Sequence, residues 1–325
     1  MPTFRLVSLL TVLVMASACS KSPTDSAPGG QPTTKKLVVG FSQIGAESGW
    51  RTANTQSIKE EAAKRGIDLR FADAQQKQEN QIKALRSFVA QGVDVIAFSP
   101  VVETGWEPVL REIKTAGIPV ILTDRSVQVS DPDLYVTFIG SDFVEEGRRA
   151  ARWLAEKTHG RAVIAELQGT PGAAPAIDRK QGFAEILAQY PEMKIIQSQS
   201  GDFTRAKGKE VMEAFLKSPE GKSITALFAH NDDMALGAIQ AIEEAGLRPG
   251  TDILIVSIDG VRAAFEAMAA GKLNCTVECN PLIGPPLFDA AEAVRAGKTL
   301  PRRVQTEEGM FEQSQAAAEL PNRKY

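Results

Sequence analysis

A short polar loop near the start of the chain combines a carboxylate, a hydroxyl, an indole and a guanidinium. Residues 47–51 read Glu-Ser-Gly-Trp-Arg and follow the apolar stretch 37–41. Glu47 accepts hydrogen bonds, Arg51 donates them, and Trp50 offers a flat apolar face. Sugars need this combination, because their hydroxyl groups require several donors and acceptors while their C–H faces pack on aromatic rings. The loop therefore indicates a carbohydrate contact.

Further polar or aromatic residues follow most of the later apolar stretches. If those stretches are parallel strands, their carboxyl ends meet at one edge of a sheet, and open α/β sheets bind ligands at that edge. We therefore expect these side chains to surround one cleft. Together with Glu47, Trp50 and Arg51, the set comprises Asp73, Asp124, Arg125, Gln168, Arg179, Asp202, Phe203, Asn231, Asp259 and Glu278.

Most of these residues also have a purely structural interpretation. Asn231 and Asp259 could cap a helix or a turn. Arg51 and Arg179 could lie on hydrated helix faces. Taken singly, the structural interpretation is favoured for each residue except the indole of the first loop, which stands outside any apolar run. Trp106, which follows a later strand, fits core packing at the start of a helix as well as it fits a ligand contact.

The elements that must position these residues form two successive series of alternating strands and helices. This alternation predicts parallel sheets with right-handed crossovers, and the similar length of the two series predicts an α/β protein with two doubly wound, Rossmann-like lobes. The expected strands are 37–41, 67–72, 93–98, 118–123 and 134–140, then 162–167, 194–198, 224–229, 253–258 and 273–279. The expected helices are 51–65, 78–91 and 105–116, then 145–157, 176–189, 205–217, 233–245, 261–270 and 285–296.

The sequence carries no recognisable catalytic or phosphate-binding motif. The glycines within 40–45 have the wrong spacing for a nucleophile elbow, and the Gly-Lys turns at 221–223 and 297–299 lack the upstream glycine of a phosphate loop. His159 and His230 are far apart, and no Cys/His zinc spacing exists. His230 ends an expected strand and could line the rim of the cleft. Nothing designates a nucleophile, and the abundant carboxylates leave acid–base catalysis open. We expect a protein that is not an enzyme and that uses no metal or cofactor.

The first residues predict export. Arg5 precedes the apolar run 6–15, which is too short to span a bilayer. The run is followed by Ala-Ser-Ala-Cys at 16–19. This ending resembles a bacterial lipobox, so we expect a signal peptide over 1–18, a lipid on Cys19 and a flexible tether over 19–36. The expected location is the periplasm or the cell surface, with a lipid anchor. An ordinary signal peptide cut nearby is the alternative.

Composition limits the function classes further. The 325 residues suffice for two domains, and a net charge of −3 provides no strong attraction for nucleic acid or an anionic membrane. Cys275 and Cys279 lie four residues apart, about 13 Å along a strand. That separation exceeds the roughly 7 Å between Cα atoms that a disulfide permits. We expect two buried free thiols.

Several segments resemble one protein family. They include Val-Gly-Phe-Ser-Gln at 39–43, the 47–51 loop, Gln-Gln-Lys-Gln-Glu-Asn-Gln-Ile-Lys at 75–83, Thr-Gly-Trp-Glu-Pro-Val-Leu at 104–110, Ala-Ile-Asp-Arg-Lys at 176–180, Gln-Ser-Gly-Asp-Phe-Thr at 199–204, Ala-His-Asn-Asp-Asp-Met at 229–234 and Ser-Ile-Asp-Gly-Val at 257–261. Over residues 37–300 the chain resembles the type I periplasmic sugar-binding proteins of bacterial ABC importers, of the ribose/galactose group. The 47–51 loop is similar to that of the galactofuranose-binding members.

This resemblance implies an architecture and a set of partners. It implies the type I periplasmic binding protein fold, with a hinge of three chain crossings near residues 140, 279 and 310. One lobe would comprise 37–140 with 280–309, and the other 141–279 with 310–325. It also implies a monomer that closes on one monosaccharide, galactofuranose foremost. The monomer would deliver the sugar to the permease and ATPase subunits of an importer, without nucleic acid and with membrane contact only through its lipid.

The resemblance also implies a role for each site residue. Residues that would hydrogen-bond sugar hydroxyls are Asp124, Arg125, Arg179, Asn231 and Asp259. The furanose end of the pocket would be shaped by Glu47, Ser48, Gly49, Trp50 and Arg51, with the indole stacking on the sugar. Phe203 would cover the sugar, and Glu278 stands where a polar contact is common.

Two other functions fit the same residues. A sensor of the same fold would present its loaded form to a signalling partner. A glycosidase could use Asp124 and Asp259 as its two carboxyl groups. Incubation with sugars separates binding from catalysis, because a binding protein returns the sugar intact and an enzyme turns it over. A repressor of similar core fold is disfavoured, because a tether precedes the core where a helix-turn-helix would stand.

Overall fold

Residues 35–325 are described by a computed structural model. The expected signal peptide, the cysteine at position 19 and the tether up to residue 34 therefore lie outside the described residues. Contacts from residue 36 to the C-terminus form one compact unit. This unit contains two separate six-stranded sheets.

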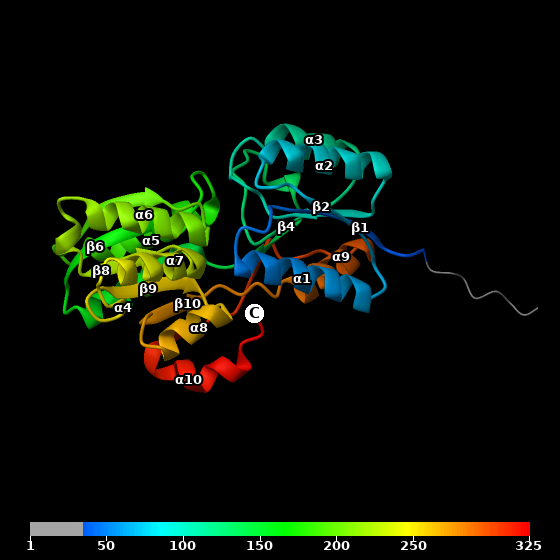
Figure 1. Cartoon of the computed structure of the whole chain (residues 1–325). Coiled ribbons are helices and arrows are strands. Elements are labelled where there is room, and N and C mark those ends of the chain that lie inside the picture. The colour runs from blue at the N-terminus through cyan, green and yellow to red at the C-terminus, as the bar shows by residue number, and fades with distance from the viewer. Residues whose placement is uncertain (1–34) are drawn as a thin grey trace, which may run out of the picture. The chain divides into compact units, whose positions relative to one another are not determined.

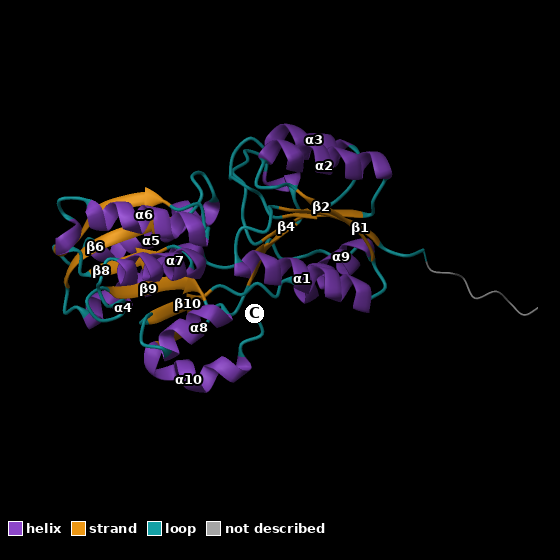
Figure 2. Cartoon of the chain, viewed as in Figure 1, coloured by secondary structure: helices purple, strands orange, loops and turns teal. Residues whose placement is uncertain are grey.

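The first sheet is wholly parallel and lies between two layers of helices (Figure 2). Its strands run in the order β11-β5-β4-β3-β1-β2. The layer of α2 and α3 covers one face, and the layer of α1 and α9 covers the other (Figure 1). The strands are β1 (Val38–Gln43), β2 (Asp68–Asp73), β3 (Val95–Phe98), β4 (Val120–Thr123), β5 (Thr137–Gly140) and β11 (Arg303–Gln305), and the helices are α1 (Gly49–Lys64), α2 (Gln78–Gln91), α3 (Glu107–Thr115) and α9 (Gly284–Arg295).

The second sheet has the same layout except at one edge. Its order is β12-β10-β9-β8-β6-β7, and only β12 runs antiparallel to its neighbour. Helices α4 and α5 pack together, as do α6 and α7. The strands are β6 (Arg161–Gln168), β7 (Glu192–Ser200), β8 (Ala226–Ala229), β9 (Leu254–Asp259), β10 (Cys275–Glu278) and β12 (Met310–Glu312), and the helices are α4 (Phe143–Lys157), α5 (Ala174–Leu187), α6 (Arg205–Lys217), α7 (Asp232–Glu244), α8 (Arg262–Ala269) and α10 (Ala316–Glu319).

The chain passes between the two sheets three times. It leaves the first sheet after β5, returns after β10, and crosses again between β11 and β12. The prediction of two doubly wound α/β lobes is thus confirmed. We call the first sheet with its helices the first lobe, and the second sheet with its helices the second lobe.

Buried apolar strands explain why these elements form. The inner strands β3, β4 and β8 are buried along their whole length, as expected for parallel strands covered on both faces. Helix α2 ends at Gly92, whose φ of 62° is the left-handed conformation that glycine adopts without strain. Trp106 is fully buried and donates from its indole to the Val102 carbonyl, so it belongs to the core. Cys275 and Cys279 are buried free thiols, as predicted.

Two of the differences from the sequence-based expectation have a clear physical reason. Helix α1 begins at Gly49, two residues before the expected start, because the Ser48 side chain accepts from the Arg51 backbone N–H and caps the helix. The strands β11 and β12 were not expected. Each has three residues, which is too short for an alternating pattern to be recognised.

Candidate functional site

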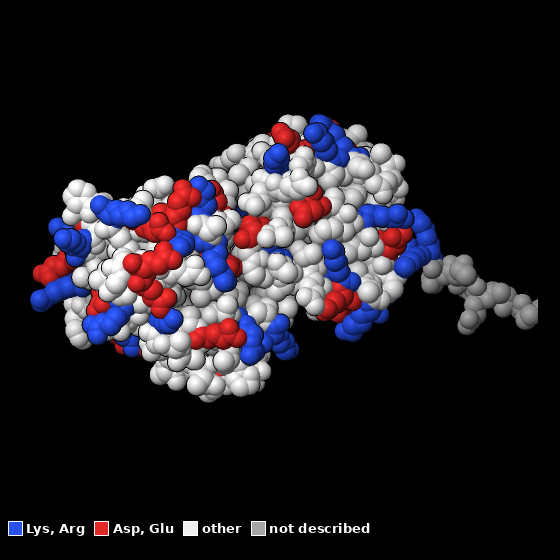
Figure 3. Space-filling view, viewed as in Figure 1, with Lys and Arg blue, Asp and Glu red and all other residues white. Residues whose placement is uncertain are grey.

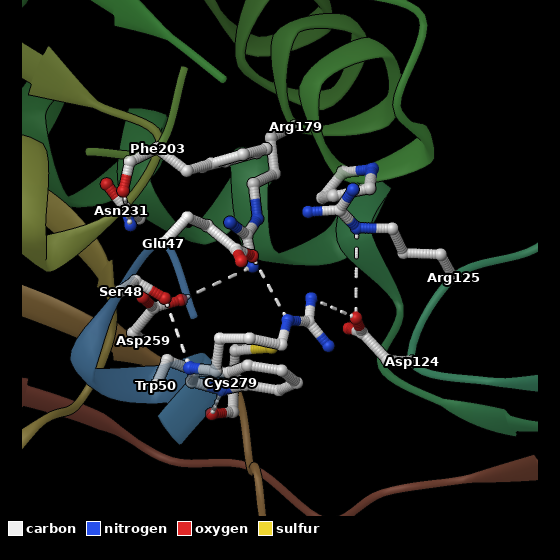
Figure 4. A pocket seen from close by; sticks show the side chains of 12 residues that line it. Glu47, Ser48, Trp50, Asp124, Arg125, Arg179, Phe203, Asn231, Asp259 and Cys279 are labelled. Carbon is white, nitrogen blue, oxygen red and sulfur yellow. Dashed lines mark hydrogen bonds and ion pairs between the residues drawn. The ribbon is translucent and has the colours of Figure 1, made fainter. Parts of the chain in front are cut away.

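A pocket of about 290 Å³, a volume that includes open solvent, collects side chains from strand ends and from helices α1 and α5 of the two lobes (Figure 4). Its lining residues are Glu47, Ser48, Trp50, Arg51, Asp124, Arg125, Pro175, Arg179, Phe203, Asn231, Asp259 and Cys279. Ten of the twelve residues predicted for the site therefore meet in one place.

Unusual backbone conformations turn several of these residues toward the pocket. Asp124, Phe203 and Asp259 have φ angles of 62°, 61° and 134°, which only glycine adopts without strain. Such conformations are found at functional sites, where the surrounding fold imposes them. Gly169 lets Phe203 approach closely, because a Cβ atom on Gly169 would lie 1.9 Å from the ring. The strand ends thus hold their side chains in fixed directions.

In the first lobe, Arg51 is the centre of a buried ion-pair network. Its guanidinium donates to Glu47 Oε1 at 3.1 Å, to Asp124 Oδ2 at 2.6 Å and to Gln43 Oε1 at 3.3 Å. Burial lowers the pKa of Arg51, but Asp124 and Glu47 outweigh that effect and leave the pKa above its ordinary value. Arg51 therefore stays charged and fixes both carboxylates.

The neighbouring Arg125 is less completely paired. Its Nη1 donates to the Val101 carbonyl at 3.0 Å, and its Nε lies 3.7 Å from Asp124 Oδ2, too far for a hydrogen bond. Among the described residues, Arg125 Nε and Glu47 Oε2 are buried and lack a hydrogen-bond partner. Burial and the nearby Arg51 lower the pKa of Arg125 to about 10. One donor and one acceptor are thus left for a ligand.

In the second lobe, hydrogen bonds to Glu146 and His230 orient Arg179. It donates to Glu146 Oε2 at 2.7 Å and to the His230 carbonyl at 2.6 Å, and it lies 3.7 Å from Asp259. Burial lowers the pKa of Arg179, but Glu146, Cys279 and Asp259, in that order, raise it more, so the net shift is upward. Burial raises the pKa of Asp259 well above its usual range, although Arg179 partly opposes it.

Asn231 and Trp50 each connect the pocket to the backbone. Asn231 caps α7 by accepting from the Met234 N–H and donates to the Phe203 carbonyl at 3.1 Å. The Trp50 indole donates to the Cys279 carbonyl at 2.6 Å, and the Arg51 guanidinium lies 4.6 Å from the centre of its ring. Trp50 therefore joins α1 of the first lobe to the crossing after β10.

Two predicted site residues are not brought to the pocket. Gly49 contributes no lining atom, and its N–H donates to Asp233. The Glu278 carboxylate accepts from Arg323, Tyr325 and the Gly309 N–H, so it holds the C-terminal segment.

Four other polar residues at strand ends also lie outside the pocket lining. Asp73 accepts from a turn N–H, Gln168 bonds Ser198, and Asp202 accepts from a nearby serine hydroxyl. His230 is fully buried and does not line the rim as expected, because its Nε2 lies 3.1 Å from Glu166 Oε1.

Sequence reasoning missed the lining residues Pro175 and Cys279 and the supporting Glu146. Cys279 directly follows Glu278, and successive side chains of an extended segment point in opposite directions. Of that pair, the structure places Cys279 and not Glu278 in the pocket lining. Glu146 lies on α4 with no sequence neighbour in the pocket, so its role shows only in the fold.

The cluster of Glu146, Cys279 and Glu308 is the one metal-like grouping found among the described residues, with one potential ligand atom from each residue within 4.8 Å of the others. Its groups already have partners in the protein. Arg179 pairs with Glu146, and Glu308 Oε1 accepts from Thr306 at 2.8 Å and from the Asn280 N–H at 3.2 Å. The cluster is therefore better explained as a hydrogen-bonded junction of the chain crossings than as a metal site.

The pocket combines acidic and basic groups, and so does the surface. The lining contains carboxyl groups of Glu47, Asp124 and Asp259 and guanidinium groups of Arg51, Arg125 and Arg179. This mixture of hydrogen-bond donors and acceptors suits a neutral polar ligand. On the face drawn in Figure 3, acidic and basic side chains are interspersed. Among the described helices, none combines the length and apolar character needed to cross a membrane.

Comparison with known proteins gives consistent matches. A family model described as a periplasmic binding protein domain matches residues 39–296. The galactofuranose-binding protein YtfQ of Escherichia coli K12 is 52% identical over 318 residues, covering 97% of this chain and 98% of that protein. The periplasmic component of the arabinose ABC transporter from Shewanella sp. ANA-3, bound to α- and β-L-arabinofuranose, aligns with a TM-score of 0.87 and 58% identity over 89% of this chain and 96% of that one. A Mycobacterium smegmatis structure in complex with β-D-fucofuranose aligns with a TM-score of 0.87 and 59% identity over 89% and 95%.

Proposed function

The chain belongs to the periplasmic binding protein family, and from that premise we propose that it captures a furanose sugar for a bacterial ABC importer. The ligand would lie in the pocket lined by Trp50 and Arg51 from the first lobe and by Arg179 and Asp259 from the second. Galactofuranose is the foremost candidate.

One observation carries this proposal. A buried pocket that contains both carboxyl and guanidinium groups holds an unpartnered acceptor, Glu47 Oε2, and an unpartnered donor, Arg125 Nε. A sugar hydroxyl donates and accepts at once, so a single neutral ligand can satisfy both atoms. Leaving them unpaired costs free energy, which ligand binding would recover.

The furanose ring form is supported by the relatives and by the 47–51 loop. The solved relatives with 58% and 59% identity are bound to arabinofuranose and in complex with fucofuranose, respectively, and YtfQ is named for galactofuranose. The loop residues Glu47, Ser48, Trp50 and Arg51 all line the pocket. A site built for particular hydroxyl positions rejects a ring that places them elsewhere.

Delivery to the importer would depend on closure of the lobes around the sugar. We assign 37–140 with 280–309 to the first lobe, and 141–279 with 310–325 to the second. A ligand that contacts both lobes stabilises the state in which they meet. The permease and ATPase subunits would then recognise this state, and the binding protein would act as a monomer.

We also propose export with a lipid on Cys19, which lies outside the described residues. The periplasmic family is consistent with export. Replacing Cys19 by serine should move the protein from the membrane fraction to the soluble fraction. A parent protein that is wholly soluble, with an unmodified N-terminus, would contradict the anchor but not the export.

Calorimetry and NMR test the ligand. The purified protein is titrated with D-galactose, L-arabinose, D-ribose and D-glucose, and the bound state is examined with ¹³C-labelled D-galactose. The ¹³C shifts should show one furanose per chain, recovered intact, with weaker binding of ribose. A bound pyranose or a preference for ribose would refute the ligand assignment. Turnover of a glycoside would instead support the glycosidase alternative that uses Asp124 and Asp259.

A further inference from the structure

We propose that Asp233 is a positioning residue that holds the 47–51 loop from the opposite lobe and thereby slows release of the sugar. The inference rests on the proposed sugar-binding function. Asp233 lies in α7 of the second lobe and does not line the pocket. Its effect would pass through Gly49, whose neighbours Ser48 and Trp50 do line it.

A short hydrogen bond joins the two lobes at this point. The Gly49 backbone N–H donates to Asp233 Oδ2 at 2.7 Å. The Asp233 side chain is 9% exposed, so water competes weakly for the bond. A hydrogen bond to a buried carboxylate is roughly twice as strong as a neutral one.

The contact also supplies a charge that α1 lacks. Gly49 is the first residue of α1, and the first turn of this helix contains no acidic residue. The N–H groups of a first turn have no partner within the helix, and the N-terminus carries a partial positive charge. Asp233 therefore satisfies one of these groups from outside the lobe to which α1 belongs.

Arg205 keeps this carboxylate in place. Its Nη2 and Nε donate to Asp233 Oδ1 at 2.9 and 3.2 Å, while the other oxygen faces Gly49. A second direct bond between the lobes runs from the Glu103 N–H to the Gly172 carbonyl at 2.9 Å. The Asp233 contact differs because a side chain makes it, so a substitution can remove it without altering the backbone.

Release kinetics test the proposal. Asp233→Ala and Asp233→Asn are compared with the parent by stopped-flow tryptophan fluorescence, with D-galactose at mutarotation equilibrium as the probe. A contact that forms only when the lobes meet changes the release rate more than the association rate. We expect Asp233→Ala to release sugar about tenfold faster with nearly unchanged association. Asp233→Asn should fall between Asp233→Ala and the parent, because its amide oxygen can still accept.

Two further variants separate this role from a general loss of stability. Asp252→Asn breaks an exposed Asp–Arg pair of the same lobe, in which Arg248 and Asp252 lie 2.6 Å apart, and should leave release unchanged. Arg205→Ala should speed release less than Asp233→Ala, since it frees the carboxylate without removing it. The melting temperature of sugar-free Asp233→Ala should stay close to that of the parent.

The outcomes distinguish this inference from the proposed function. A parent protein that binds none of the sugars overturns the proposed function. A parent that binds sugar, with a release rate unchanged in Asp233→Ala, overturns the role of Asp233 alone. Faster release accompanied by an equal change in Asp252→Asn, or by a lower melting temperature of the sugar-free protein, overturns it as well.

Discussion

Arg125 and Arg179 face the same pocket from different lobes, yet their surroundings move their pKa values in opposite directions. Both side chains are almost completely buried. Burial and Arg51 lower the pKa of Arg125 to about 10, whereas Glu146 and Asp259 overcome burial and raise the pKa of Arg179. The positive charge of Arg125 is thus only partly balanced by its surroundings, whereas Arg179 is held in a close ion pair.

The difference suggests a division of labour in ligand binding. Arg179 is oriented before the ligand binds, because its guanidinium donates hydrogen bonds to Glu146 and to the His230 carbonyl. Arg125 keeps an unpartnered Nε, so a ligand oxygen there would supply the compensation that the protein lacks. Arg179 is therefore preorganised for the ligand. Arg125 gains a hydrogen-bond partner only when the ligand binds, and this adds to the binding free energy.

The largest effect on binding is expected from Arg179→Lys. A lysine ammonium cannot reach Glu146 Oε2 and the His230 carbonyl together in the geometry of a planar fork. We expect sugar affinity to fall by about 100-fold, or roughly 2.7 kcal/mol, and the melting temperature to fall too, measured by calorimetry and thermal unfolding. Arg125→Lys is the matched control and should lose less affinity. Equal losses in both variants would contradict the difference between the two sites.

Glu146→Gln tests the pairing of Arg179 through its pH dependence. Burial raises the pKa of Glu146 to about 8, although Arg179 opposes it, from an ordinary value of 4.5. Between these values the folded chain binds more protons than the unfolded chain, so the free energy of unfolding should fall as the pH rises from about 5 to about 8. The slope for one group is at most about 1.4 kcal/mol per pH unit.

Denaturant unfolding between pH 5 and pH 9 measures this slope. Glu146→Gln should reduce it. Part of the slope should remain, because burial also raises the pKa of Asp259 and of Glu308. An unchanged slope would mean that burial does not move the titration of Glu146 into this pH range.

Arg125→Met should separate affinity from stability. The variant keeps most of the side-chain length but removes the unpartnered Nε and a buried charge. Affinity should fall about tenfold, the cost of one charge-assisted hydrogen bond. The melting temperature of the sugar-free protein should match or exceed that of the parent, because an undercompensated buried charge destabilises the fold. A fall in both quantities would place Arg125 in the same class as Arg179.

Trp50→Phe should have a smaller effect. Phenylalanine keeps an aromatic face in the pocket but loses the 2.6 Å bond from the indole to the Cys279 carbonyl. A neutral hydrogen bond contributes about 1 kcal/mol, so affinity should fall roughly fivefold. Trp50→Ala should weaken binding further. If Trp50→Phe binds as tightly as the parent, the indole N–H is irrelevant to the pocket, and only its apolar surface counts.

The fold was predictable from sequence because its signals are local. Apolar strands such as 93–98 and 224–229, and glycine helix ends such as Gly92, are read from a few neighbouring residues. The short strands β11 and β12 have no such signal, since the partner strand defines them. Their pairing depends on contacts with β5 and β10 that are distant in sequence.

Part of the pocket lining was predictable because polar residues at the carboxyl ends of strands meet in one place. Asp124, Asn231 and Asp259 follow this rule, whereas Arg51 and Arg179 reach the pocket from helices α1 and α5. The supporting groups do not follow the rule either, because Glu146 and Asp233 lie within helices and act through other residues. Sequence position identifies what faces the ligand, whereas the fold alone shows what holds those side chains in place.

Glu278→Gln should have the smallest effect on binding, and it tests the boundary of the site. The carboxylate accepts from Arg323 Nη1 at 2.8 Å, the Tyr325 hydroxyl at 3.0 Å and the Gly309 N–H at 2.9 Å. All three partners belong to the last 17 residues of the chain, counted from Gly309 to Tyr325. Losing the charge should weaken the attachment of this segment and lower the melting temperature. Sugar affinity should change by less than about twofold, because no hydrogen bond of Glu278 reaches the pocket. Arg323→Gln should lower the melting temperature similarly. A loss of affinity in Glu278→Gln as large as that in Arg125→Met would show that the C-terminal segment influences the pocket. In that case the surroundings of Arg125 and Arg179 alone would not explain sugar binding.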